Sequence, residues 1–427
     1  MRRLRLLTAG ESHGPEMSGI LEGLPAGLRV STAGVNRDLA RRQHGYGSGR
    51  RMLIEQDRVE WTAGIRFGRT LGSPIAFTID NRDWENWSEK MAQEPRPASR
   101  RPKPITLARP GHADLAGAIK YDTDDIRDVL ERASARSTAP RVAAGAVCRQ
   151  LLASVGVRIW SFVDQLGPIR AFPDVEDPLS AIADDWWKRD LAGPTPLRCP
   201  DPVAEAAMRA EVDAVIDAGD SIGGSFVVVA EGLPIGLGSN AEWDTRLDSG
   251  LAAAVMGIQA IKGVEIGLGF GVVPRRGSQV HDEVDAAQPG WARRTNRAGG
   301  IEGGMSNGEP VVVRAAVKPV ATLRKPLDSV DLATGQSGRA HIERSDVAIL
   351  PRAAIVGEAM VALVLADALM TTFGGDTIGD LHAAVRRRRA RSVGPRGRSG
   401  AGEQEILPEN AAAEATPREP VSPGTDA

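Results

Sequence analysis

The spacing of apolar residues along the chain predicts helices that alternate with short strands. Five segments carry apolar positions at helical spacing, or stay apolar over a helical length: 33–43, 125–155, 203–219, 247–262 and 352–373. Pro140 is expected to kink or restart the second of these helices. The last includes "AAIVGEAMVALVLADALM", which contains Glu358 and Asp367, so we expect a buried core helix and not a membrane span.

Between the helices lie shorter runs of strand type. They are the opening "LRLLTAG", the segments 52–61 and 74–80, the strand–turn–strand unit "GGSFVVVAEGLPIGLG", and two strands around 311–324. Residues 82–106 hold Trp, Pro, Arg and Lys without periodicity, which predicts a long surface loop of the kind that is usually functional or disordered. Residues 172–202 are rich in Pro and Asp and are expected to be an insertion.

Composition narrows the class of protein. The chain has 427 residues, enough for a large core, and length alone suggests two or three domains. A net charge of -2 argues against a dedicated nucleic-acid binder. Cys148 and Cys199 make neither a zinc pattern nor a disulfide framework, and the apolar run at the N-terminus is too short for a signal peptide, so a cytoplasmic location is expected.

The C-terminal part has a different character. From about Arg386 the chain is basic and Gly-rich ("RRRRARSVGPRGRSG"), and an Ala/Glu/Pro-rich stretch without core residues follows. We expect 386–427 to be a tail outside the folded domain, with 390–427 disordered. The cluster Arg386–Arg389 is interpreted as a solvated charge run, with nucleic-acid contact as the alternative.

Two histidines stand in similar settings, His13 in "GESHG" and His112 in "RPGHAD". Small neighbours leave each imidazole open to a ligand, as a general acid or base requires, and Glu11 and Asp114 lie beside them. A polar residue in a turn is the alternative for each. No metal site is expected, because neither histidine has HxxxH-type spacing or a second nearby soft ligand.

Arginines gather around the same stretches. Arg41, Arg42, Arg50 and Arg51 surround the glycines of "HGYGSGRR", and Arg132, Arg136 and Arg141 follow one another in "ERASARSTAPR". If that segment is helical, Arg132 and Arg136 share one face, where like charges favour an anion between them over a merely solvated face.

The densest glycine signal is "GGIEGGMSNG" at 299–308. Consecutive unobstructed N–H groups form anion-binding nests, with a plain turn cluster as the alternative. The dinucleotide-binding fingerprint is absent. The residues alone therefore indicate an enzyme with acid/base histidines and a phosphorylated, polyanionic substrate, and they leave the reaction unnamed.

Taken together, the motifs resemble those of the chorismate synthase family. The matching stretches occur in order from residue 8 to 376: "TAGESHG", "LARRQHGYG", "RPGHADLAGAIKY", "ERASAR", "VAAGAV", "DSGLAAAVMGIQAIKGVEIG", "RRGSQVHDE", "NRAGGIEGGMSNGEP", "RAAVKPVATL", "RSDVAILP" and "EAMVALVLADAL" with "FGGD". Each stretch alone is weak, whereas eleven in order are specific.

The resemblance implies an α/β (α+β) sandwich, with central helices between two antiparallel β-sheets, in one domain spanning 1–385. It implies a homotetrameric lyase that binds reduced FMN and converts 5-enolpyruvylshikimate-3-phosphate to chorismate and phosphate. The reaction is a 1,4-anti elimination without net redox change. Some members of the family reduce their flavin with NADPH. No reductase segment is visible in this chain, so we expect the flavin to be reduced externally.

The resemblance also assigns residues. His13 would protonate the leaving phosphate, His112 would keep the reduced flavin correctly protonated, and Asp346 would assist proton removal. Arg109 and Asp114 are expected to be the neighbours that orient His112. The residues that would hold phosphate and carboxylate groups are Arg42, Arg50, Arg51 and Arg136. The flavin would contact Arg132, Ala133, Ser134, Gln259, Ala260, Gly303, Lys318, Pro319, Val320, Ala321, Thr322 and Arg344.

Two positions depart from the family pattern. Ser48 stands where an arginine is usual, and Ser137 stands where a glutamate is usual, with Pro140 following. These changes leave open a second reading, a catalytically impaired paralogue that binds flavin or anions and keeps the fold.

Overall fold

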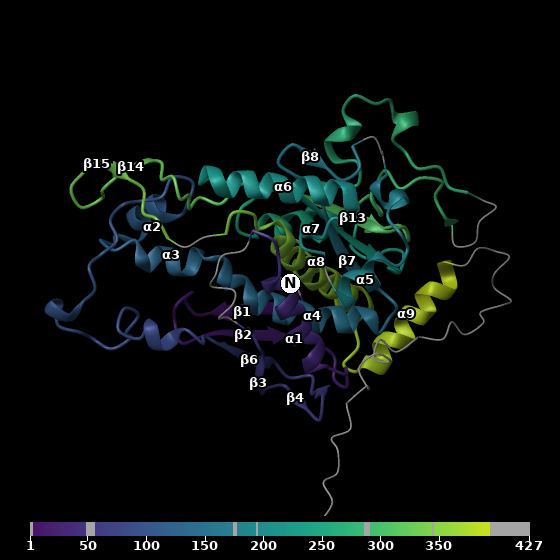
Figure 1. Cartoon of the computed structure of the whole chain (residues 1–427). Coiled ribbons are helices and arrows are strands. Elements are labelled where there is room, and N and C mark those ends of the chain that lie inside the picture. The colour runs from purple at the N-terminus through teal and green to yellow at the C-terminus, as the bar shows by residue number, and fades with distance from the viewer. Residues whose placement is uncertain are drawn as a thin grey trace, which may run out of the picture.

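Two antiparallel sheets enclose a double layer of helices in the computed structural model, which describes residues 3–47, 56–173, 177–193, 195–285, 291–343 and 346–392. Figure 1 shows the first sheet in purple and blue on one side and the second sheet in teal and green on the other, with α4 and α8 between them. The predicted fold class is confirmed.

The first sheet has the strand order β1-β2-β6-β3, with bounds β1 Arg5–Ala9, β2 Glu16–Glu22, β6 Ile75–Asp80 and β3 Glu60–Ala63. Side chains alternate across it, so that Ile75, Phe77 and Ile79 of β6 face the core while their neighbours do not. The small hairpin β4 Ile65–Arg66 and β5 Arg69–Thr70 follows β3. This sheet therefore presents one covered face, toward the helices.

The second sheet has the order β10-β13-β9-β7-β8, with bounds β10 Ile261–Ile266, β13 Val311–Val317, β9 Gly224–Glu231, β7 Arg158–Leu166 and β8 Ile169–Arg170. Its central strands are buried on both faces. Trp160 and Phe162 of β7 pack with Trp186 in a small outer core, while Val163 faces the main core. The segment predicted to be an insertion therefore packs on this sheet: its helix α5 Trp186–Ala192 covers the outer face of β7.

The inner layers are α1 Thr32–Gln43 and α4 Ala139–Ala153 on the side of the first sheet, and α7 Leu247–Met256 and α8 Leu350–Phe373 on the side of the second. Helices α4 and α8 approach closely at Gly145, where an added Cβ would lie 2.5 Å from the Cβ of Ala359. Helix α8 is long and apolar enough to span a membrane, but 72% of its most apolar window is buried inside the protein. The expected core helix is confirmed.

The remaining elements surround this sandwich (Figure 1). They are the helices α2 Asp114–Tyr121, α3 Arg127–Ala133, α6 Pro202–Ala218 and α9 Ile378–Ser392, and the hairpins β11 Ile301–Glu302 with β12 Met305–Ser306 and β14 Asp328–Val330 with β15 Ser337–Arg339. Residues 82–106 contain only two single-turn 3₁₀ helices, as a long loop would.

The helix interruption expected near Pro140 is confirmed. Ser134, whose extended backbone ends α3, is followed by a 3₁₀ turn, and α4 restarts at Ala139 with Pro140 in its first turn, where its missing N–H costs nothing. Other predicted boundaries were wrong for local reasons. Helix α7 ends at Met256, and β10 begins at Ile261, inside the predicted helix. Only one of the strands expected around 311–324 forms there, because Pro319 and the loop after β13 follow it.

The C-terminal boundary also differs from the prediction. Helix α9 runs through the arginine cluster to Ser392, which suits arginine's helix propensity and the preference for basic residues in a last turn. The cluster is not merely solvated: Arg388 and Arg389 donate to the carbonyls of Ile235 and Gly232, at 3.1 and 2.7 Å. Residues 393–427 lie outside the described part of the chain.

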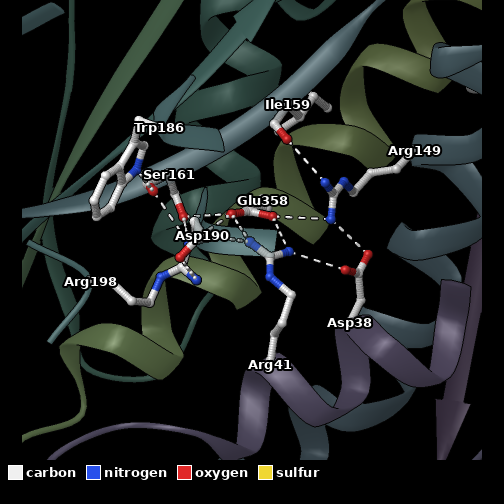
Figure 2. A network of polar contacts seen from close by, with 9 residues as sticks. All are labelled: Asp38, Arg41, Arg149, Ile159, Ser161, Trp186, Asp190, Arg198 and Glu358. Atoms are coloured by element: carbon white, nitrogen blue, oxygen red, sulfur yellow. Dashed lines mark hydrogen bonds and ion pairs between the residues drawn. The ribbon is translucent and has the colours of Figure 1, made fainter. Parts of the chain in front are cut away.

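A buried network of charged groups joins these layers (Figure 2). Glu358 of α8 accepts from Arg41 of α1, with both oxygens at 2.9 Å, and from Arg198 at 3.2 Å. Arg41 also pairs with Asp190 of α5 at 2.8 Å. The side chain of Arg41 therefore points into the core and does not contribute to a ligand site. Its ion pairs hold helix α1 in place, and with it the next residue, Arg42.

Candidate active site

His13 lies in the segment between β1 and β2 and is held by Glu131 of α3. Its Nδ1 lies 2.9 Å and 3.0 Å from the two carboxylate oxygens, and its backbone N–H donates to the same carboxylate at 2.8 Å. Both residues are buried. The carboxylate that bonds His13 is thus that of Glu131, and Glu11, two residues away, takes part in a tight turn in which its backbone carbonyl accepts from Gly14. Burial and a carboxylate on Nδ1 fix the imidazole and direct Nε2 away from Glu131.

Two of the predicted anion-binding arginines meet nearby. Asp57 bridges Arg42, which pairs with one of its oxygens, and Arg136, which lies 3.1 Å from the other. All three side chains are almost fully buried. Burial raises the pKa of the Asp57 carboxyl, but the two guanidiniums outweigh it and hold the pKa below its usual value. Asp57 therefore stays ionised between the two guanidiniums.

The expectation that Arg132 and Arg136 share a helical face was wrong. Ser134 separates them, since its backbone leaves the helical region and its hydroxyl then caps the 3₁₀ turn at 135–138. Arg132 instead donates to the carbonyls of Thr8 and Gly10, at 2.9 and 3.0 Å. The anion between neighbouring arginines is the protein's own Asp57.

His112 forms a second, local cluster with Arg109 and Asp114, as the sequence predicted. Its Nδ1 is hydrogen-bonded to Asp114 Oδ1, and Arg109 Nε lies 2.8 Å from Asp114 Oδ2. Burial raises the pKa of Asp114, but hydrogen bonds from His112 and Arg109 dominate and hold it well below its usual value. Because an ionised carboxylate only accepts, Nδ1 carries a proton toward Asp114, and Nε2 is the ring nitrogen left for a ligand.

Substituting Asp114 by Asn tests this orientation. The amide cannot accept in the same way from both Nδ1 and Arg109, so we expect turnover to fall by up to about 100-fold through misplacement of the imidazole. Asp122→Asn, at the exposed C-terminal end of the same helix, should leave turnover unchanged. Steady-state rates of the two variants under identical conditions check this. Equal rates for Asp114→Asn and wild type would contradict the orienting role.

A chain of ionisable side chains connects the two histidine clusters. Glu343 lies 3.7 Å from Arg109 and 3.9 Å from Arg127, and Arg127 reaches Glu131 at 3.0 Å. Sequence reasoning missed these groups, together with Asp57 and Trp87. Only the i,i+4 spacing of Arg127 and Glu131 was visible as a signal.

Some of the other predicted residues contact these clusters directly, and others lie further away. Asp346 pairs with Arg352, a cation that also acts on the buried Arg42. Lys318 donates to the carbonyl of Gly111, directly before His112, and Thr322 accepts from Arg109 at 3.1 Å. The loop 318–322 with Pro319, Val320 and Ala321 is therefore brought to the His112 cluster.

Four predicted flavin contacts occupy a neighbouring region. Ser134 Oγ lies 3.0 Å from Ser12 Oγ, one residue before His13, and follows Ala133 at the end of α3. Gln259 Nε2 donates to Ser137 Oγ at 2.7 Å, so the serine that departs from the family pattern is engaged by a predicted flavin contact. Ala260 follows with a φ of 70°.

Gly303 lies in the turn between β11 and β12, beside Gly304, which packs against Ser239 and Arg246. The contacts of the described residues do not bring Gly303 to either histidine. Ser48, Arg50, Arg51 and Arg344 lie outside the described residues. Among the residues described, no group of three or more His, Cys, Asp or Glu side chains could hold a metal ion.

Comparison with known proteins places the chain. A family model for chorismate synthase matches residues 4–370. The chorismate synthase of Geobacter metallireducens is 52% identical over 386 residues, covering 88% of this chain and 96% of that protein. That of Desulforudis audaxviator is 54% identical over 380 residues, covering 88% and 95%. A crystal structure of a chorismate synthase superimposes with a TM-score of 0.73 at 39% identity, covering 92% of this chain and 99% of that one. The chain belongs to the chorismate synthase family and converts 5-enolpyruvylshikimate-3-phosphate to chorismate.

Proposed function

We propose that the reaction proceeds on this chain as a 1,4-anti elimination of phosphate that uses bound reduced FMN without net redox change. The observation that carries the proposal is the pair of histidines, each with a carboxylate at Nδ1, at two ends of one linked cluster of arginines. Such a cluster combines proton transfer with binding of a dianionic leaving group.

The residues present fit a flavin. Gln259 Oε1 is a buried acceptor without a partner among the described residues, and an isoalloxazine edge offers an N–H donor. The residues that would hold the flavin are Arg132, Ala133, Ser134, Gln259, Ala260, Gly303, the segment 318–322 and Arg344. When bound, reduced FMN supplies electron density for the loss of phosphate and the base for the C6 hydrogen.

Phosphate and carboxylate groups of the substrate would bind at Arg42 and Arg136, with Arg50 and Arg51. Arg42 suits this role because its buried Nε has no hydrogen-bond partner in the described structure. A phosphate or carboxylate oxygen at this point would accept from that Nε–H, a charge-assisted hydrogen bond. His13 would donate its ring proton to an oxygen of the departing phosphate.

His112 would hold or exchange a proton on the reduced flavin through Nε2, since Nδ1 is committed to Asp114. Asp346 would assist removal of the proton transferred from substrate, and its pairing with Arg352 keeps it beside the arginine cluster. Each of the three proton-handling roles is thus assigned to a different side chain: His13, His112 or Asp346.

We also infer how the enzyme is organised. Residues 1–385 would act as one catalytic domain, since the main core cluster draws side chains from Leu4 to Val385. The chain would work as a homotetramer in the cytoplasm, its two buried cysteines free.

The flavin would be reduced by an external reductase, with NADPH a direct substrate only if reduction is intrinsic. Neither nucleic acid nor membrane is a proposed partner.

An anaerobic assay tests the cofactor requirement. Purified protein supplied with 5-enolpyruvylshikimate-3-phosphate and chemically reduced FMN, without NADPH, is expected to form chorismate and phosphate in equal amounts. Oxidised FMN with NADPH should give none unless a flavin reductase is added. Turnover without reduced flavin would reject the cofactor proposal, and turnover with NADPH and oxidised FMN alone would reject external reduction.

A further inference from the structure

A tryptophan from the long loop lies flat against His13. The rings of Trp87 and His13 are stacked, with centroids 3.7 Å apart and planes 28° from parallel. The guanidinium of Arg127 lies over the Trp87 ring, 5.2 Å from its centroid, and also pairs with Glu131. His13, Glu131, Arg127 and Trp87 thus form a closed ring of four contacts, in which Trp87 is the only member from outside α3 and the β1–β2 connection.

Trp87 is itself held in place. Its Nε1 donates to Asp83 Oδ2 at 2.9 Å, and the backbone N–H of Asp83 donates to Asn81 Oδ1 at 3.1 Å. Asn81 is buried and ties the start of the loop to the histidine segment, since its side-chain amide donates to the carbonyl of Gly14 at 2.7 Å. Hydrogen bonds through Asp83 and Asn81 therefore link the indole to Gly14, the residue that follows His13.

We propose that Trp87 is a positioning residue for His13. The inference rests on the proposed role of His13 as the acid for the leaving phosphate. A hydrogen bond from Nδ1 to Glu131 fixes the direction of one ring edge. Contact with the indole face constrains the plane of the ring and thereby the direction of Nε2. The loop 82–106 is by this account part of the active site, through one side chain.

A double-mutant cycle tests the proposal. Trp87→Leu is expected to lower kcat by about 10- to 100-fold, the cost of a misplaced catalytic group, without changing the affinity for FMN or substrate. In the His13→Ala background the same substitution should cost nothing further, because no imidazole remains to be positioned. Trp87→Phe, which keeps an aromatic face, should restore most of the lost kcat. Trp84→Leu, in the same 3₁₀ turn, is the matched control and should leave kcat unchanged.

The outcomes separate the two claims. An equal loss in both backgrounds, no loss from Trp87→Leu, or no rescue by Phe would overturn the positioning role of Trp87. Normal turnover by His13→Ala alone would instead overturn the acid role of His13. If Trp87→Leu does not fold, as judged by circular dichroism, Trp87→Met replaces it in the same cycle.

Discussion

Replacing His13 by alanine is expected to lower turnover by about 10²- to 10⁴-fold, the usual contribution of a general acid. The loss should fall on kcat, because the arginines that bind the phosphate remain. The structure adds a second expectation: removal of the imidazole leaves a gap between the Trp87 face and the Glu131 carboxylate. Added imidazole could occupy that gap and donate a proton in its place.

The measurement is the anaerobic rate of phosphate release as a function of imidazole concentration. We expect a saturable rise for His13→Ala and no effect on wild type. The matched control is His382→Ala on α9, where the ring bonds Ser154 and no active-site group. Near wild-type turnover by His13→Ala would reassign His13 to a structural role.

The two histidines show which parts of the site could be predicted from the sequence. The partners of His112 lie within five residues of one another in "RPGHAD", so a short motif contains the whole triad and was interpreted correctly. His13 and Glu131 lie 118 positions apart, and only the fold brings them together. The acidic residue nearest in sequence, Glu11, therefore gave no indication of the carboxylate that bonds His13. A local pattern predicts local geometry and no more.

The same distinction holds for the rest of the fold. The strict alternation in β6 and the core-facing spacing of α1 predicted these elements directly. The role of the segment 172–202 could not be predicted in this way, because it depends on Trp186 packing against a strand distant in sequence. Arg41 and Arg42 are adjacent and identical in type, yet one enters the core network and the other the active site. The ordered family motifs, and not these spacings, predicted the reaction.

Removing the charge of Glu358 is expected to be the most destabilising single change away from the histidines. Its carboxylate is buried and pairs with Arg41, Arg149 and Arg198, while Ser161 donates to it at 2.6 Å (Figure 2). Glu358→Gln keeps the shape but removes the carboxylate that all three arginines share; Asp38 and Asp190 remain in the described part of the network. Unpairing buried charges costs about 3–5 kcal/mol, so we expect a fall of that size in the free energy of unfolding.

The contribution of Glu358 to the free energy of unfolding is expected to depend on pH in one direction. Burial raises the pKa of Glu358, but the arginines, Arg41 foremost, outweigh it and lower the pKa from 4.5 to about 2. A folded-state pKa below the unfolded one means stability that is complete above pH 4.5 and lost as the pH falls toward 2. Wild type should lose about 3 kcal/mol across that window from this group, and Glu358→Gln should lack that loss.

Urea denaturation of both proteins between neutral and acidic pH measures the difference. The matched control is Glu231→Gln, whose carboxylate pairs with Arg158 near the surface and should cost no more than about 1 kcal/mol. Equal unfolding free energies for Glu358→Gln and wild type would mean that the network contributes no net stability. A fall in stability joined to weaker substrate binding would show that Glu358, through Arg41, also holds α1 where Arg42 meets Asp57.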